Sequence, residues 1–516
     1  MTLEHRITGA PGAGKTERLR SGVERYVDRG EYDPDEIVLT SFTRAAAAVL
    51  RGRIEVPHEN VATLHSLARR TLGGSPPIAE VGALAKQWNE SGIPAQWRVG
   101  KPVASEEDGL AVVDESGDVL AEYSLARSKM LPASHPVWTR LRGFGERWEA
   151  FKRETGSVDF TDMISLALTE TDACYGEPPV IIVDEAQDLV PLQWALVRRW
   201  AAHWTVERFI VAGDPAQVLY GFAGARPDEF LGGEGSREML PRSHRLPRAI
   251  AAYAERLLRL HSGELTVGRE YQPREEEGTV RRLGATWRDP DVIVAQAAAI
   301  AAEGRTVAIL ATCSYMLEPT VRELRDRGLL FHNPYRRSNG RWNPLGAPRE
   351  GTVRTLDRVR AFTEARDPHL WLPLLRASAY AQRGGKKHAE AEPLTWREWA
   401  THEAIAAVEA GDLRWLQANA MKETQSALGY AAALLRRGPL DADTEPRIVI
   451  GTGHSIKGGE CDVTFLLPDV SQAGAAEMAA GPAGRDAAVR LAYVMATRAR
   501  SELVICAPSG RDALEV

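Results

Sequence analysis

The stretch 9-GAPGAGKT-16 contains the residue types that hold a nucleoside triphosphate. In the pattern GxxxxGK[ST], glycines let successive backbone N–H groups turn toward phosphate oxygens at the start of a helix. The expected nucleotide-binding residues are Gly9, Ala10, Pro11, Gly12, Ala13, Gly14, Lys15 and Thr16. Lys15 would reach the β- and γ-phosphates, and Thr16 would bind Mg²⁺. A glycine-rich turn without a ligand and a small nucleotide kinase are also compatible with this segment.

A second motif, 181-IIVDEAQD-188, ends an apolar run in two adjacent carboxylates. A strand of this kind would place Asp184 at the metal and Glu185 beside it, where Glu185 could activate a water molecule as general base. The alternative is an ordinary helix N-terminus enriched in acidic residues. Together with the glycine-rich segment, the two carboxylates favour an enzyme that hydrolyses nucleoside triphosphates.

Short apolar runs are the elements that must position these motifs. Before residue 236 the runs lie around residue 7 and at 37–41, 180–184 and 209–214, and after it at 307–310, 447–451 and 502–506. Because helical stretches separate the runs, they predict parallel sheets covered on both faces. Two α/β cores are therefore expected.

The composition is that of an ordinary globular protein long enough for several domains. The 516 residues are 44% hydrophobic and 26% charged, with a formal net charge of −6. Because there is no long apolar run and no signal peptide, we expect a cytoplasmic protein without a membrane partner. The four cysteines lie far apart without CxxC spacing, which argues against a zinc ribbon or an iron–sulfur cluster. Contact with nucleic acid would require a local groove, since the net charge is negative.

Eight segments, in order along the chain, resemble motifs of the UvrD/Rep-like DNA helicases of superfamily 1. They are 38-VLTSFTRAAAAVLRGRI-54, 63-TLHS-66, 158-VDFTDM-163, 181-IIVDEAQD-188, 213-GDPAQVLYGFAGA-225, 240-LPRSHRLP-247, 452-TGHSIKGGE-460 and 493-YVMATRA-499. The resemblance implies two RecA-like parallel-sheet P-loop domains, each with a mainly helical insertion.

The order of the motifs implies domain boundaries. The first RecA-like domain, 1A, would comprise residues 1–69 and 150–235, with insertion 1B at 70–149. The second, 2A, would comprise residues 236–335 and 441–516, with a reduced insertion 2B at 336–440.

The resemblance also implies roles for single residues around ATP. Gln217 matches the glutamine that senses the γ-phosphate, and Glu460 matches a glutamate associated with the ribose. Arg245 and Arg498 match arginine fingers, because spreading transition-state charge requires a planar and permanently charged donor. His244 stands where most members have a tyrosine that stacks on adenine, and no adenine-recognising glutamine motif precedes the glycine-rich segment. Looser selection of ATP is therefore expected.

A further set matches family positions along the DNA strand: Phe42, Arg44, Thr63, His65, Tyr220, Phe222 and His454. Aromatic side chains stack on bases without reading sequence, and polar or basic groups contact phosphates. Outside these motifs, the same aromatic residues would be assigned to the core. Ala223 replaces an arginine that is common in the family, which removes one phosphate contact.

The implied function is that of an ATP- and Mg²⁺-dependent DNA helicase that moves 3′ to 5′ on single-stranded DNA and unwinds duplex DNA. Its partners would be single-stranded and tailed duplex DNA. The alternative is an ATPase that translocates on single strands and strips proteins from them without efficient unwinding, since the 2B insertion is short. A small-molecule kinase is disfavoured because it has no use for the later motifs. The sequence does not distinguish repair, replication and defence.

Overall fold

The computed structural model describes residues 4–41, 47, 50–74, 76–99, 119–232, 235–260, 272–336, 339–345, 353–381, 395–422, 424–438 and 445–516. The chain divides into two compact units, each built around a six-stranded sheet. The first unit comprises Met1–Thr279, Ala473–Ser501 and Glu515–Val516, and the second comprises Val280–Gln472 and Glu502–Leu514. The α/β fold class expected from the sequence is confirmed.

The first sheet has the strand order β3-β2-β4-β5-β1-β6. Its strands are β1 (Glu4–Gly9), β2 (Ile37–Ser41), β3 (Val61–Thr63), β4 (Val180–Asp184), β5 (Arg208–Gly213) and β6 (Gly235–Leu240). Neighbouring strands are parallel, with Ile7 opposite Ala212 and Leu39 opposite Ile182. Every residue of β2 and β4 is buried, as expected for central strands covered on both faces.

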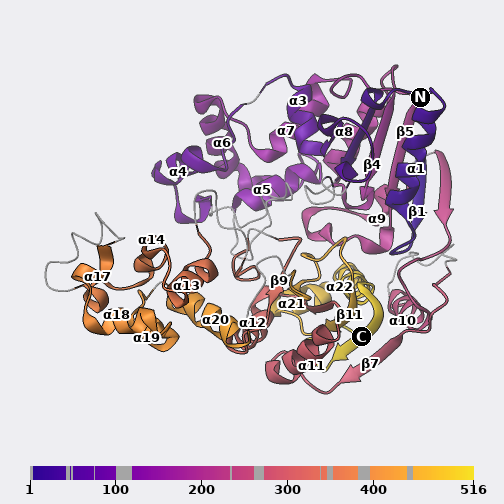
Figure 1. Cartoon of the computed structure of the whole chain (residues 1–516). Coiled ribbons are helices and arrows are strands. Elements are labelled where there is room, and N and C mark those ends of the chain that lie inside the picture. The colour runs from indigo at the N-terminus through magenta and orange to yellow at the C-terminus, as the bar shows by residue number, and fades with distance from the viewer. Residues whose placement is uncertain are drawn as a thin grey trace. The chain divides into compact units, whose positions relative to one another are not determined.

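Helices cover both faces of the first sheet. On one face lies α1 (Lys15–Asp28), and on the other lie α3 (Leu64–Thr71), α7 (Phe160–Glu170) and α8 (Pro191–Ala201) (Figure 1). Leu19 and Val23 of α1 share a core with Ile7 and Leu39, whereas Leu196 of α8 belongs to the core on the opposite face. This alternation explains why the strands read as continuous apolar runs.

A helical insertion belongs to the first unit. It contains α4 (Gly82–Glu90), α5 (Val119–Ser128) and α6 (Val137–Thr155), around an aromatic core in which the rings of Trp88 and Trp148 lie 4.8 Å apart. A buried ionic network joins the insertion to the start of α7. Lys152 Nζ lies 2.8 Å from Asp159 Oδ2 and 2.6 Å from Asp162 Oδ2, and Arg127 pairs with the same two carboxylates.

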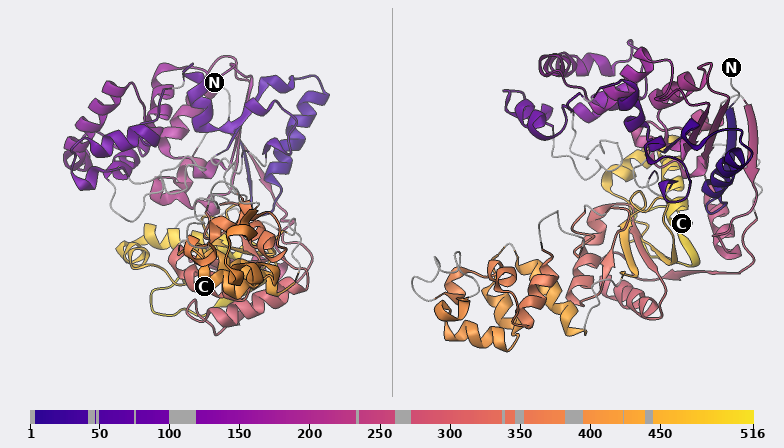
Figure 2. Two further views of the ribbon diagram at one scale, coloured as in Figure 1. Left: turned by 60° about the vertical axis from the view of Figure 1, so that its left-hand side comes forward. Right: turned by 45° about the horizontal axis from the view of Figure 1, so that its top comes forward.

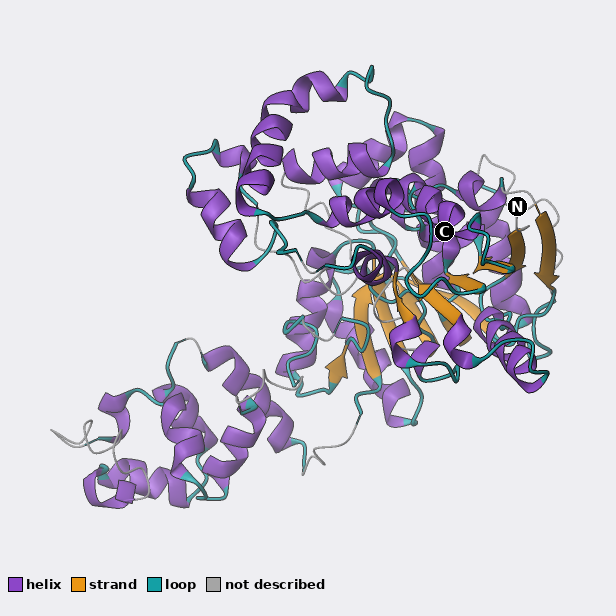
Figure 3. Ribbon diagram, turned by 90° about the horizontal axis from the view of Figure 1, so that it is seen from above, coloured by secondary structure: helices purple, strands orange, loops and turns teal. Residues whose placement is uncertain are grey.

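The second sheet has the order β7-β12-β11-β8-β10-β9. Its strands are β7 (Thr279–Leu283), β8 (Val307–Ala311), β9 (Phe331–His332), β10 (Ile448–Thr452), β11 (Cys461–Leu466) and β12 (Ala499–Cys506). Parallel pairing sets Ile450 and Phe465 on either side of Ile309. The covering helices include α11 (Pro290–Ala302), α12 (Glu318–Asp326) and α20 (Gln425–Arg436). Helices and strands are distinguished by colour in Figure 3.

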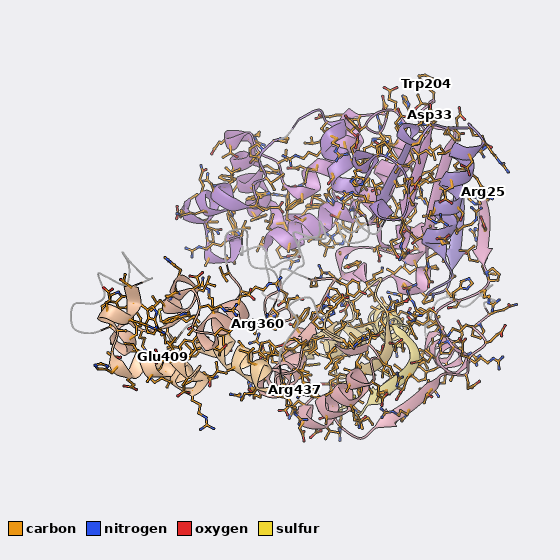
Figure 4. All side chains as sticks on the ribbon, in the orientation of Figure 1. Arg25, Asp33, Trp204, Arg360, Glu409 and Arg437 are labelled. Atoms are coloured by element: carbon orange, nitrogen blue, oxygen red, sulfur yellow. The ribbon has the colours of Figure 1, made fainter. Side chains whose placement is uncertain are left out.

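A second group of helices has a core of its own. It contains α13 (Thr355–Thr363), α14 (Pro368–Trp371), α15 (Ala377–Tyr380), α17 (Trp396–Trp399), α18 (His402–Glu409) and α19 (Leu413–Asn419) (Figure 2). The rings of Trp371 and Trp396 lie 5.0 Å apart in that core. Glu409 at the end of α18 is exposed and pairs with Arg397 (Figure 4).

The compact units divide the chain differently from the boundaries expected at residue 236. Residues 235–240 form β6, which pairs with β1 and completes the first sheet. The first unit also includes α10 (Arg248–Leu258) and α22 (Pro482–Ala496), whose Leu258 and Tyr493 share a core with Leu219. Among the described residues, no helix is long and apolar enough to span a bilayer.

Candidate nucleotide site

The glycine-rich segment forms the turn between β1 and α1. Gly12 and Gly14 have φ of 73° and 80°, a left-handed conformation that favours glycine, and Gly14 is the N-cap of α1. Lys15 is the first residue of the helix, and its Nζ donates to the carbonyl oxygen of Gly9 at 3.0 Å. A helix N-terminus behind such a turn presents backbone N–H groups to an anion, as the sequence predicts.

The acidic pair lies at the carboxyl end of β4, which is two strands from β1. The hydroxyl of Thr16 donates to Asp184 Oδ2 at 3.2 Å, so the two predicted metal ligands are adjacent. Burial, followed by the charge of Glu185, raises the pKa of Asp184 to about 6. Glu185 has φ of 53°, a left-handed conformation that is uncommon for non-glycine residues.

Arg498 reaches this site from the end of α22. Its guanidinium is 1% exposed, and Nη2 donates to Gln217 Oε1 at 2.9 Å. The amide of Gln217 in turn donates to Asp214 Oδ2 at 2.8 Å. A second hydrogen bond, from Arg498 Nε to the carbonyl of Val494 at 2.9 Å, fixes the direction of the side chain.

The segment 243–245 packs directly against the glycine-rich turn. Ser243 Oγ donates to the carbonyl of Pro11 at 2.7 Å, and the backbone N–H of His244 donates to the carbonyl of Gly12 at 2.8 Å. A Cβ atom at Gly12 would lie only 2.3 Å from Cβ of Arg245, so this approach requires glycine. The backbone and Cβ of Arg245 therefore lie beside the predicted phosphate site.

His244 lines an open cavity of about 580 Å³ next to this turn. The other lining residues are Arg242, Arg274, Glu275 and Glu276. These charged side chains offer both donors and acceptors to a bound group, and among the described residues the imidazole is the one aromatic ring that lines the cavity. The arrangement is compatible with a nucleobase that is held loosely.

Two residues near the site were not singled out from the sequence. Gln187 is fully buried, and its Oε1 accepts from the backbone N–H of Asp214 at 3.1 Å while its Nε2 donates to Glu185. Asp214 joins this amide to Gln217. Gln187 and Asp214 lie inside two of the motifs named above. The sequence of a motif does not show which neighbour a buried side chain contacts.

Comparison with known proteins shows which family carries these motifs. Residues 2–236 match the family described as UvrD/REP helicase N-terminal domain. Residues 2–236 are therefore similar to the N-terminal domain of the UvrD/Rep helicases. It is 24% identical to the ATP-dependent DNA helicase UvrD2 of Mycobacterium tuberculosis (strain ATCC 25618 / H37Rv), over 98% of this chain and 77% of the relative.

Two other relatives in the UvrD/Rep group align over shorter stretches. DNA helicase IV of Escherichia coli (strain K12) is 24% identical over 50% of this chain and 45% of its own length. The ATP-dependent DNA helicase PcrA of Leuconostoc citreum is 27% identical over 44% of this chain and 32% of its own. The resemblance seen in the sequence is therefore confirmed at the level of the family.

The aromatic residues expected along a DNA strand differ in exposure. Phe222 is 37% exposed, whereas Tyr220 is 3% exposed, with the two rings edge to face at 6.0 Å. Burial, with the charges of Asp188 and Glu185, raises the pKa of the Tyr220 phenol. Tyr220 is thus buried with its ring against that of Phe222, and its predicted contact with DNA stays a prediction.

The remaining predicted strand contacts in the first unit also have local structural roles. The buried Thr63 is the N-cap of α3, and its Oγ1 accepts from the backbone N–H of Ser66 at 3.4 Å. His65 is half-buried with its ring edge to face on Phe160. Phe42 and Arg44 lie outside the described residues.

The last two predicted site residues belong to the second unit. His454 and Glu460 lie in the turn after β10, where the carbonyl of His454 accepts from the N–H of Lys457 at 3.4 Å. Glu460 is exposed immediately before β11. Their roles toward ribose and DNA stay predictions.

Proposed function

We propose that this chain is an ATP-dependent DNA motor that translocates 3′ to 5′ on single-stranded DNA and unwinds duplex DNA. The observation that carries the proposal is the hydrogen bond from Arg498 to Gln217, because it joins two motifs that are 281 residues apart in sequence. The UvrD2 and PcrA relatives bear the names of ATP-dependent DNA helicases, which supports the same activity here.

The proposed hydrolysis uses groups from five motifs. Lys15 would contact the β- and γ-phosphates, and Glu185 would orient the attacking water. Arg498 and Arg245 would stabilise the charge that spreads over the transferred phosphoryl group. Gln217 accepts a hydrogen bond from Arg498, which supports the proposal that Gln217 reports the state of the γ-phosphate.

The donor set fits Mg²⁺. Thr16 Oγ1 and Asp184 Oδ2 are 3.2 Å apart, and a hydroxyl and a carboxylate oxygen are ligand types that this hard cation prefers. Bound Mg²⁺ would neutralise part of the negative charge of the phosphates. Ionised Asp184 and the hydroxyl of Thr16 would hold it beside the start of α1.

The proposed strand contact is Phe222, which lies at the loop that follows Gln217. Its exposed ring offers a stacking surface, and the buried Tyr220 fixes its orientation. In this proposal the predicted insertions 1B (70–149) and 2B (336–440) keep the boundaries given above, whereas β6 extends the sheet of domain 1A to residue 240. ATP binding and release would then change the grip on the strand as the two RecA-like domains close and open.

Unwinding and protein displacement separate the proposal from its alternative. We would measure strand separation of 3′-tailed and 5′-tailed duplexes, and in parallel the displacement of streptavidin from biotinylated single strands. Unwinding of the 3′-tailed duplex, lost in Glu185→Gln, supports the helicase. Displacement of streptavidin without strand separation identifies a translocase instead, and activity on the 5′-tailed duplex alone would contradict the proposed polarity.

A further inference from the structure

Gln187 occupies a fully buried position between the acidic pair and the start of the Gln217 loop. Its Oε1 accepts from the backbone N–H of Asp214 at 3.1 Å. Its Nε2 donates to Glu185 Oε2, and it lies 3.4 Å from Asp188 Oδ2. One side chain thus contacts Glu185, the proposed general base, and Asp214, which begins the Gln217 loop.

The orientation of this amide is determined by its partners. A backbone N–H can only donate, so the atom facing Asp214 must be the amide oxygen. The NH₂ group must then face the carboxylates, where both hydrogens have acceptors in Glu185 and Asp188. A flipped amide would set NH₂ against N–H and oxygen against carboxylate.

The end of β5 packs closely against Gln187. A Cβ atom at Gly213 would lie 2.2 Å from Gln187 Oε1 and 3.0 Å from the ring of Phe230. Since atoms do not approach this closely, glycine at the end of β5 is what lets the amide contact the backbone there. Close packing on both sides leaves the amide little freedom to move.

A continuous series of hydrogen bonds runs from Glu185 to Arg498. Glu185 accepts from Gln187, Gln187 accepts from Asp214 N–H, Asp214 accepts from Gln217, and Gln217 accepts from Arg498. Three of the four hydrogen bonds are buried, and the one between Gln187 and Glu185 is partly buried. An unpaired polar group in such surroundings carries a high free-energy cost. A shift at one end is therefore expected to disturb the other.

We propose that Gln187 is a positioning residue that holds the carboxylate of Glu185 in the orientation required for ATP hydrolysis and ties it to the Gln217–Arg498 pair. The inference rests on the proposed function, because ATP hydrolysis is its readout. Gln187 does not touch the nucleotide in this account. It acts through Glu185, so its removal lowers kcat with little effect on the KM for ATP.

The first test compares Gln187→Ala with Gln193→Ala. Gln193 is a buried glutamine six residues further on, whose Oε1 accepts from the N–H of Val190 at 3.1 Å at the start of α8. Misplacing a catalytic group costs about 100-fold in rate. We expect kcat to fall about 10- to 100-fold in Gln187→Ala with KM changed less than about threefold, and Gln193→Ala to keep both values within about twofold. Equal kcat in wild type and Gln187→Ala would overturn the proposal.

The second test is a double-mutant cycle with Glu185→Gln. If Gln187 acts through Glu185, adding Gln187→Ala to Glu185→Gln lowers the single-turnover rate by less than about threefold further, because effects of residues that act as a unit are not additive. A further loss as large as in the wild-type background would show that Gln187 has a different role and would overturn the inference.

Two more variants keep the proposal testable if Gln187→Ala does not fold. Gln187→Glu has the same shape but places a carboxylate against Glu185, and Gly213→Ala pushes on Gln187 Oε1 from the other side. Both are expected to lower kcat as Gln187→Ala does, and wild-type kcat in both would count against the proposal. Absence of ATP hydrolysis in the wild type would instead refute the proposed function itself.

Discussion

Arg498 Nη2 and Gln217 Oε1 are joined by a 2.9 Å hydrogen bond, although 281 residues separate them in sequence. The guanidinium is almost completely buried, and its Nε is occupied by the carbonyl of Val494. A buried arginine requires fixed acceptors because its charge is costly to desolvate. Its orientation beside Gln217 is therefore specified by the protein.

Replacement of Arg498 by lysine preserves the charge but removes the planar group. Lysine cannot donate to Gln217 and Val494 at once with this geometry. We expect kcat for ATP hydrolysis to fall about 10³-fold, the lower end of the effect of an arginine finger. Steady-state ATPase assays check this, with binding of a fluorescent ATP analogue as the control. A variant that retains kcat within about threefold would exclude the finger role.

Removal of the Phe222 ring tests the proposed strand contact. Loss of one stacked base costs about 1–3 kcal/mol, so Phe222→Ala should weaken binding of a dT oligomer by about 5- to 150-fold. Tyr175 is a suitable control because it is 48% exposed but precedes β4, at the opposite end of the parallel strands from Asp184. Fluorescence anisotropy measures both variants, and equal weakening by Tyr175→Ala would argue against a specific role of Phe222.

Glu80 should make stability depend on pH. Burial, then the charge of Asp159, raises the pKa of Glu80 from 4.5 to about 8 in the folded chain. The folded protein then holds a proton that the unfolded chain releases, so stability falls as pH rises from about 4.5 to about 8. Glu80→Gln can still accept from the N–H of Phe160, which now donates to Glu80 at 2.7 Å, but it does not titrate.

Thermal unfolding at several pH values checks the Glu80 prediction. The Tm advantage of Glu80→Gln over wild type should grow between about pH 5 and about pH 8, reaching about 2 °C or more. The exposed Glu90 of α4, replaced by Gln, serves as control and should show no such trend. A Tm difference that is the same at both pH values would contradict the buried, protonated state of Glu80.

His244 should give weak selection between nucleobases. It lines an open and highly charged cavity, and an imidazole covers less of a base than a phenol ring. We expect ATP to be preferred over GTP by less than about 100-fold in kcat/KM, far below the about 10⁴-fold of a site built around hydrogen bonds to the substrate. His244→Tyr should tighten ATP binding about 2- to 10-fold through stacking. Sharp ATP selectivity of the wild type in a competition assay would disprove this.

Much of the fold follows from local patterns in the sequence. The buried strands β2 and β4 could be recognised because parallel strands covered on both faces are continuously apolar. β6, with the sequence GSREML and mostly exposed residues, has no such pattern. β6 forms by pairing with the edge of β1. Because its own residues show no strand pattern, the sequence predicts a domain boundary at residue 236, inside this strand.

The site was predictable in its residue types but not in its contacts. The motif letters indicate Lys15, Thr16 and Asp184 because phosphate and metal chemistry restricts the choice of residue. Tyr220 and Phe222 are two residues apart and chemically similar, yet one is buried and the other exposed. That difference depends on the short helical turn Tyr220–Ala223 and on tertiary packing, which no sequence period reports.

The most direct test of the motor is the ATPase rate with and without single-stranded DNA, for wild type and Glu185→Gln. Coupling between the DNA strand and the nucleotide predicts a slow wild-type rate that increases at least about tenfold with DNA. The variant should have a rate about 10²- to 10⁴-fold lower under both conditions. Hydrolysis by the wild type that DNA leaves unchanged would contradict the account, even if the nucleotide site is correctly assigned.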